Sequence, residues 1–279
     1  MTAFCSGFAL LALVSAPAVL AAQLPADDST VAARLNASPR HGEWVRYDAG
    51  GGDSVRAWVV YPERRDRAGV VVVIHEIYGL TDWIRGVADQ LAADGFIAVA
   101  PDLLSGKGPN HSGSESVDRQ GAVALVRALS RDEVTRRLVA AGRYGTGRPA
   151  ARGDVATIGF CWGGSTSFHM ATAWQSGGGS LRGAIVYYGS SPDSAGLAEL
   201  RAPVLGLYGG DDARVNATVP PAQAELRRLG GGRRFEVETY AGAGHGFLRD
   251  QAGRGGANRR ATEQAWPRTI AFLREVLGR

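Results

Sequence analysis

A cysteine on a tight turn flanked by glycines is the residue of this chain best suited to covalent chemistry. Residues 159–164 read Gly-Phe-Cys-Trp-Gly-Gly; an apolar run at 155–158 precedes them and a helical pattern at 165–174 follows. A strand, a sharp turn and a helix are the context of a nucleophile elbow, where larger residues in place of the glycines would collide with neighbouring segments. The motif predicts that Cys161 is a nucleophile. The alternative is a buried cysteine in an ordinary strand–helix turn.

The first 22 residues bear on how this thiol is used. They contain no Asp, Glu, Lys or Arg, and their apolar stretch at 8–20 ends in small residues. This pattern predicts a signal peptide at 1–22 and a periplasmic or secreted protein; the alternative is an uncleaved anchor, although a span needs about 20 apolar residues. Cleavage would remove Cys5 and leave Cys161 as the sole thiol. A lone thiol in an oxidising compartment is at risk unless it is shielded or used, which favours the nucleophile.

A base and an orienting acid for such a nucleophile follow it in the chain. Asp211 and Asp212 come after the strand pattern at 204–208, and His245 lies among glycines after the strand pattern at 235–240. A thiol nucleophile needs a base, and the base needs a group that orients it. The alternatives are a turn-forming pair of aspartates and a solvated loop histidine.

An acyl-transfer site also needs two N–H donors for the developing oxyanion. The backbone N–H of Trp162 is one candidate, and the loop 75–79 after the third predicted strand is the source of the other. His75 ends that strand, and we expect it to have a positioning role. His41, His111 and His169 are less well placed.

The elements that must position these residues alternate along the chain. A length of 279 residues with 45% hydrophobic content suits one large core. Strands alternating with helices imply parallel βαβ units, so we expect a doubly wound, mostly parallel α/β sheet with helices on both faces. Its first two strands are expected to be antiparallel. The predicted strands are 43–47, 55–61, 70–74, 96–100, 155–160, 183–188, 204–208 and 235–240; the predicted helices are 81–94, 116–141, 165–174, 221–229 and 265–277.

The segments between these elements complete the organisation. A polar segment, 23–40, precedes a single domain at 41–279. The stretch 101–116 is a long loop after a strand end and a candidate substrate rim. Residues 142–153 and 253–258 are expected to be surface loops.

The charge distribution argues against a nucleic-acid partner. The formal net charge is +4, but the arginines are scattered and form no basic stripe. We expect a monomer that acts on a small molecule, with no metal, no organic cofactor and no stable membrane association after signal cleavage.

Three motifs in order along the chain resemble the dienelactone hydrolase family of α/β-hydrolases. They are His-Glu-Ile-Tyr-Gly at 75–79, Gly-Phe-Cys-Trp-Gly-Gly at 159–164 and Gly-His-Gly-Phe at 244–247, and the resemblance extends from about Val55 to the C-terminus. It implies an α/β-hydrolase fold and the hydrolysis of small esters or lactones through a thioester acyl-enzyme. No cofactor is implied.

The resemblance also implies roles for individual residues. The pattern Gly-x-x-Asp-x-x-Val matches 209–215 and selects Asp212 as the acid of a Cys161-His245-Asp212 triad. Glu76 would contact the resting thiol and assist its deprotonation, although a buried structural carboxylate is an alternative. Ile77 and Trp162 would supply the oxyanion N–H groups.

Substrate recognition is the point at which the chain departs from the family. Relatives that act on the carboxylated dienelactone use two arginines; Arg249 resembles one, and Lys107 could replace the other as a point charge without a bidentate fork. Tyr78 is expected to line the same site. This departure and the export signal leave the substrate open, because catechol-derived lactones are usually processed in the cytoplasm. A general carboxylesterase and a redox-sensing domain without catalysis remain alternatives.

Overall fold

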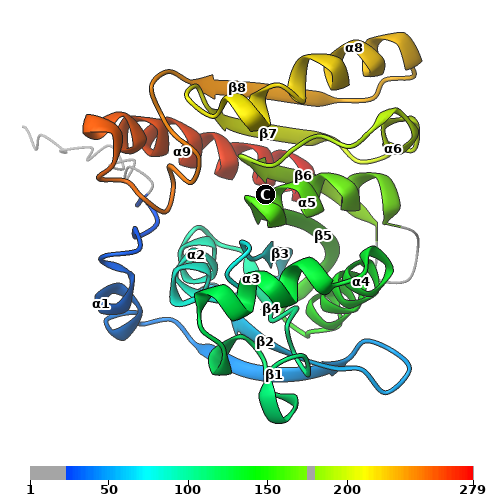
Figure 1. Cartoon of the computed structure of the whole chain (residues 1–279). Helices are drawn as coiled ribbons and strands as arrows, with labels where there is room; N and C mark the ends of the chain where they lie inside the picture. The colour runs from blue at the N-terminus through cyan, green and yellow to red at the C-terminus, as the bar shows by residue number, and fades with distance from the viewer. Residues whose placement is uncertain (1–22, 175–179, 279) are drawn as a thin grey trace, which may run out of the picture.

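A mostly parallel sheet runs through the centre of the molecule. The computed structural model describes residues 23–174 and 180–278, and within them eight strands follow the order β1-β2-β4-β3-β5-β6-β7-β8 (Figure 1). Strand β2 is antiparallel to both of its neighbours, β1 and β4, and every other pairing is parallel. The strands are β1 (Gly42–Asp48), β2 (Ser54–Val60), β3 (Ala68–Ile74), β4 (Ile97–Pro101), β5 (Ala151–Phe160), β6 (Leu181–Tyr187), β7 (Val204–Gly209) and β8 (Phe235–Tyr240). The predicted fold class is confirmed, including the antiparallel start.

Helices cover both faces of this sheet, as Figure 1 shows. Strand β3 explains why its sequence is apolar at successive positions: Val71 and Val73 face one layer, while Val70 and Val72 face the other. One layer holds α1 (Val31–Asn36), α2 (Asp82–Ala93) and α9 (Ala257–Leu277); the other holds α4 (Arg131–Thr146), α5 (Trp162–Ala173), α6 (Ser194–Ala198) and α8 (Val219–Leu229). Helix α3 (Arg119–Ala128) packs on Leu104, Ile77 and Trp162 near the carboxyl ends of the strands, and α7 (Ala213–Asn216) follows β7.

The predicted helix at 116–141 is two helices, and the predicted loop at 142–153 is mostly ordered structure. The break falls at Leu129, after which the Ser130 side chain accepts a hydrogen bond from the Glu133 N–H at 3.2 Å and caps α4. Helix α4 continues to Thr146 and β5 starts at Ala151. The glycines that suggested a loop instead allow close packing, because a Cβ at Gly145 would lie 2.6 Å from a Val70 methyl.

The C-terminal helix is longer than predicted, and two predicted loops contain short 3-10 turns. The terminal helix begins at Ala257, before the predicted residue 265, and takes in Pro267; residues 253–258 contain the 3-10 turn Arg254–Gly256. The long loop 101–116 likewise holds two 3-10 turns, Pro109–His111 and Ser114–Ser116. The buried Asp102 anchors this loop, accepting hydrogen bonds from the N–H and the hydroxyl of Ser114 at 2.9 and 2.5 Å.

The N-terminal part of the chain packs onto the sheet's α2 and α9 layer. The polar segment 23–40 contains α1, whose Val31 side chain lies against Gly86 of α2. The predicted signal peptide at 1–22 lies outside the described residues. Among the residues that are described, no helix combines the length and the apolar character needed to cross a membrane.

Candidate active site

Cys161 lies on a strained turn between β5 and α5. Its backbone has φ 57° and ψ −116°, in a region that residues other than glycine rarely adopt. A Cβ at Gly159 would lie 1.9 Å from the carbonyl oxygen of Gly163, and one at Gly163 would lie 2.4 Å from that of His75. Glycine is therefore required on both sides of the cysteine, which is the steric reason that the motif suggested.

The environment of the thiol keeps it protonated in the resting molecule. Burial raises the pKa of Cys161, the negative charge of Glu76 raises it further, and the backbone N–H of Trp162 opposes these effects. A thiol whose pKa is raised needs a base before it can attack a carbonyl.

His245 and Asp212 form a closely paired base and acid. The imidazole Nδ1 lies 2.6 Å from Oδ2 of the buried Asp212, and Oδ1 of Asp212 accepts a hydrogen bond from the Val215 N–H at 3.4 Å. With Nδ1 donating to the carboxylate, Nε2 is left as the basic nitrogen. The neighbouring Asp211 instead pairs with the exposed Arg254 at 3.1 Å. The geometry thus selects Asp212 over Asp211.

The carboxylate of Glu76 contacts the guanidinium group of Arg249. Oε2 of the buried Glu76 is 2.8 Å from Nε of Arg249, so the two side chains form a close ion pair. Burial raises the pKa of Glu76 to about 7, and the charge of Arg249 partly opposes the rise. Glu76 therefore acts on Cys161 through its charge while its carboxylate rests on the arginine.

His75 orders the loop expected to bind the oxyanion. It is fully buried, its ring stacks on Trp162 with centroids 5.6 Å apart, and its Nδ1 lies 2.7 Å from the carbonyl oxygen of Glu76. That carbonyl shares a peptide plane with the N–H of Ile77, so the hydrogen bond also fixes the direction of this N–H. Burial lowers the pKa of His75, so the ring is neutral.

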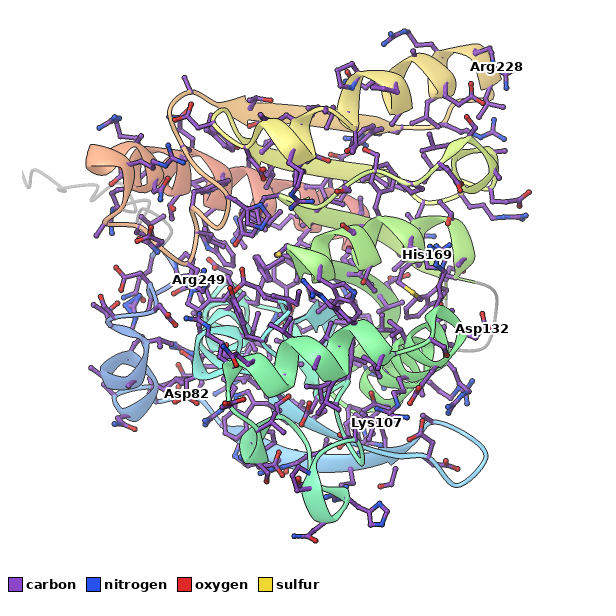
Figure 2. The ribbon with its side chains drawn as sticks, viewed as in Figure 1. Asp82, Lys107, Asp132, His169, Arg228 and Arg249 are labelled. Carbon is purple, nitrogen blue, oxygen red and sulfur yellow. The ribbon has the colours of Figure 1, made fainter. Side chains whose placement is uncertain are left out.

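The second guanidinium group near Tyr78, besides that of Arg249, belongs to Arg119. The Lys107 ammonium pairs with Glu133 at 2.8 Å, and Figure 2 shows the lysine well apart from Arg249. The Tyr78 ring instead lies near two guanidinium groups, with its centroid 3.9 Å from Cζ of Arg119 and 5.7 Å from Cζ of Arg249. Sequence reasoning missed Arg119 because the second cation was expected directly after strand β4. Arg119 lies farther along the chain, after the long loop, at the start of α3. The only signal was its place just after the helix-capping Asp118.

Tyr188 is a second residue that sequence reasoning did not single out. It is fully buried after β6, has φ 41°, and meets the His245 ring edge-on with centroids 5.1 Å apart. Its hydroxyl has no partner among the described residues, and burial raises its pKa well above the usual value, with the charge of Glu76 adding to the rise. Its strained backbone was the kind of feature that only coordinates reveal.

These groups suit acyl transfer. The Cys161 thiol, the pair of His245 with Asp212 and the loop ordered by His75 all follow the carboxyl ends of parallel strands, where open α/β sheets place their sites. In the described part of the chain, no group of three or more His, Cys, Asp or Glu side chains has the arrangement of a metal site.

Comparison with known proteins identifies the family. Residues 55–277 match the model of the dienelactone hydrolase family. A carboxymethylenebutenolidase of Pseudomonas putida is 31% identical over 186 residues, covering 65% of this chain and 76% of the relative.

Solved structures show the same fold. A dienelactone hydrolase-like promiscuous phosphotriesterase from metagenomic libraries aligns with a TM-score of 0.68 and 24% identity, covering 86% of this chain and 99% of the other. For a dienelactone hydrolase of Anabaena variabilis the TM-score is 0.62 and the identity 20%, with 85% and 99% covered. With the family model matched over most of its length, the chain belongs to the dienelactone hydrolase family of α/β-hydrolases, and it is a hydrolase of ester or lactone bonds.

Proposed function

We propose that this hydrolase is exported and cleaves small esters or lactones with a Cys161-His245-Asp212 triad through a thioester acyl-enzyme. One observation carries the proposal: the strained elbow presents a protonated thiol at the sheet edge where His245 is held by Asp212 at 2.6 Å. The composition of residues 1–22 supports export.

The reaction proceeds in two halves. Nε2 of His245 takes the thiol proton, and the sulfur attacks the substrate carbonyl while the N–H groups of Ile77 and Trp162 hold the oxyanion. The tetrahedral intermediate collapses and expels the alkoxide, which takes the proton from the imidazolium. The acyl group remains on Cys161 as a thioester. Water then gives a proton to His245 and attacks the thioester, and the acid leaves as the thiol is regenerated.

Glu76 assists the first proton transfer. A substrate that binds Arg249 weakens the ion pair at 2.8 Å, and the carboxylate then loses the charge that stabilises its ionised form. Glu76 becomes more basic at the moment when Cys161 must lose its proton.

The substrate class follows from the two guanidinium groups near Tyr78. Arg249 and Arg119 could both hold a substrate carboxylate, and a planar fork suits that task better than an ammonium. The rival proposal is a general carboxylesterase, which the existing pairing of Arg249 with Glu76 favours because the cation is already compensated.

The triad is tested with the variant Cys161→Ala and an activated aryl ester. Turnover should be abolished in this variant, and turnover at the wild-type rate would disprove the mechanism. Cys161→Ser is less decisive because serine serves in the same elbow. Iodoacetamide should inactivate the wild type. A redox sensor without catalysis would show no hydrolysis in any variant.

The substrate class is tested with Arg249→Ala on a neutral and an anionic ester. The variant should lose activity mainly on the anionic ester if a carboxylate is bound, whereas equal effects on both would favour the general carboxylesterase.

A further inference from the structure

The segment 23–30, here called the N-terminal strap, lies across the loop that carries Arg249. The amide of Gln251 donates a hydrogen bond to the carbonyl oxygen of Pro25 at 2.8 Å, and the indole N–H of Trp83 donates to that of Ala26 at 3.1 Å. The N–H of Asp28 donates to the carbonyl oxygen of Arg249 at 3.0 Å. These three hydrogen bonds hold the strap against α2 and against the loop that carries Arg249.

The strap also brings a second carboxylate to Arg249. Oδ2 of Asp28 lies 3.5 Å from Nη1 of Arg249, while Glu76 lies at Nε on the same guanidinium. The Asp28 side chain is 51% exposed and that of Glu76 only 5%, so Asp28 is the carboxylate that can move away into water. The strap carboxylate thus stands at the outer end of the arginine, on the side open to solvent.

We propose that Asp28 is a specificity-determining residue: it occupies Arg249 in the resting molecule, and an anionic substrate must displace it. This inference rests on the proposed role of Arg249 in binding substrate. The strap is then part of the active site, and Asp28 sets the preference of the enzyme between neutral and anionic esters.

The charges around Glu76 give the direction of the effect. Glu76 and Asp28 carry two negative charges when ionised, and Arg249 and Arg119 carry two positive charges; Cys161 and Tyr188, which also face Glu76, are neutral at rest. Removing the charge of Asp28 leaves one cation in excess, so an incoming carboxylate is bound more strongly. Asp28 also raises the pKa of Glu76 through its negative charge.

Substitution Asp28→Asn tests the proposal, with Asp27→Asn as the matched control. The carboxylate of Asp27 is in the same strap but accepts hydrogen bonds only from Ser29 and Thr30 among the described residues. Benzoate binding, measured by calorimetry on the full chain, should tighten in D28N by up to about fivefold, the range of an exposed ion pair. It should be unchanged in D27N and lost in Arg249→Ala.

Ester hydrolysis gives the second measurement. D28N should raise kcat/KM for mono-4-nitrophenyl succinate relative to 4-nitrophenyl acetate by a similar factor. It should also lower the midpoint pH at which kcat/KM rises as Glu76 ionises, because the charge of Asp28 raises the pKa of Glu76. A merely structural strap would reduce both activities and leave that pH unchanged. Equal benzoate affinities in wild type and D28N, or an equal gain in D27N, would overturn the inference. Failure of the proposed triad mechanism would be seen separately, as hydrolysis that survives in Cys161→Ala.

Discussion

Nε of Arg249 lies 2.8 Å from Oε2 of Glu76, the carboxylate whose negative charge raises the pKa of Cys161. The arginine comes from the loop after β8 and the carboxylate from the end of β3, beside the elbow of Cys161. In the proposed mechanism an incoming anion competes with Glu76 for the arginine, and this competition couples substrate binding to proton transfer.

The pKa of Glu76, raised to about 7 by burial, predicts an acid limb in the activity. In the proposed mechanism only the ionised carboxylate assists the transfer of the thiol proton to His245, so kcat/KM should rise as the pH increases through about 7. Glu76→Gln should lower activity and remove this contribution to the profile. The measurement is kcat/KM for mono-4-nitrophenyl succinate from pH 5 to 9, and a profile of the variant parallel to that of the wild type would contradict the prediction.

The same shift predicts how stability depends on pH. The folded-state pKa of Glu76 lies above its ordinary value of 4.5, so the folded protein binds more protons than the unfolded chain between about 4.5 and 7. Linkage then requires the contribution of Glu76 to the free energy of unfolding to fall as the pH rises through this window. Urea unfolding at pH 5 and 7.5 should show that the free energy of unfolding falls less between these pH values in Glu76→Gln than in the wild type.

Asp212 and Asp211 offer a matched pair at adjacent positions. Asp212→Asn should reduce kcat by about 10³ to 10⁴, as loss of the orienting carboxylate does in serine triads, because the imidazole tautomer is no longer fixed. Asp211→Asn removes only an exposed pair with Arg254 and should change activity less than about twofold. Similar losses in both variants would indicate a disturbed turn and not a triad.

The elbow and the succession of strands and helices along the chain could be predicted from sequence because local rules determine them. The pattern at 159–164 needs glycines for steric reasons that the backbone itself imposes, and the continuous apolar run of β3 reflects burial on both faces. The break at Ser130 was not predicted, although a serine three residues before Glu133 is a capping signal, because apolar residues continue across it.

The cation near Tyr78 could not be found in the same way. Lys107 and Arg119 both follow β4 in the chain, and the resemblance to the family pointed only to the nearer one. Which of them reaches Tyr78 depends on how Asp102 folds the loop back through Ser114, and on Glu133 of α4 taking the lysine. These are contacts between distant segments, and no local pattern encodes them.

This difference between Arg119 and Lys107 is itself testable. Arg119→Ala should lower kcat/KM for mono-4-nitrophenyl succinate by several-fold to tenfold and leave 4-nitrophenyl acetate nearly unchanged, because the guanidinium lies 3.9 Å from the Tyr78 ring centroid at the site. Lys107→Ala should not alter the ratio of the two activities, since its ammonium is paired with Glu133. A change of ratio in Lys107→Ala alone would reverse the assignment.

Gly163 connects the packing of the elbow to the stability of the whole domain. A methyl group there would lie 2.4 Å from the carbonyl oxygens of both His75 and Ile74, which belong to backbone and cannot rotate away. Gly163→Ala should therefore destabilise the protein by about 3 kcal/mol or more, at the upper end of the range for overpacking.

Gly153 is the control for this substitution. It lies in β5, and a Cβ there would meet nothing within 4 Å, so Gly153→Ala should leave the free energy of unfolding within about 0.5 kcal/mol of the wild type. Urea unfolding and hydrolysis of 4-nitrophenyl acetate should be measured on both variants. Because β3 must move for a side chain to fit at residue 163, the displaced loop would also carry the Ile77 N–H away from Cys161, and any Gly163→Ala protein that folds should have lost activity. Full activity in that variant would show that the elbow tolerates the shift and that this contact does not position the oxyanion donors.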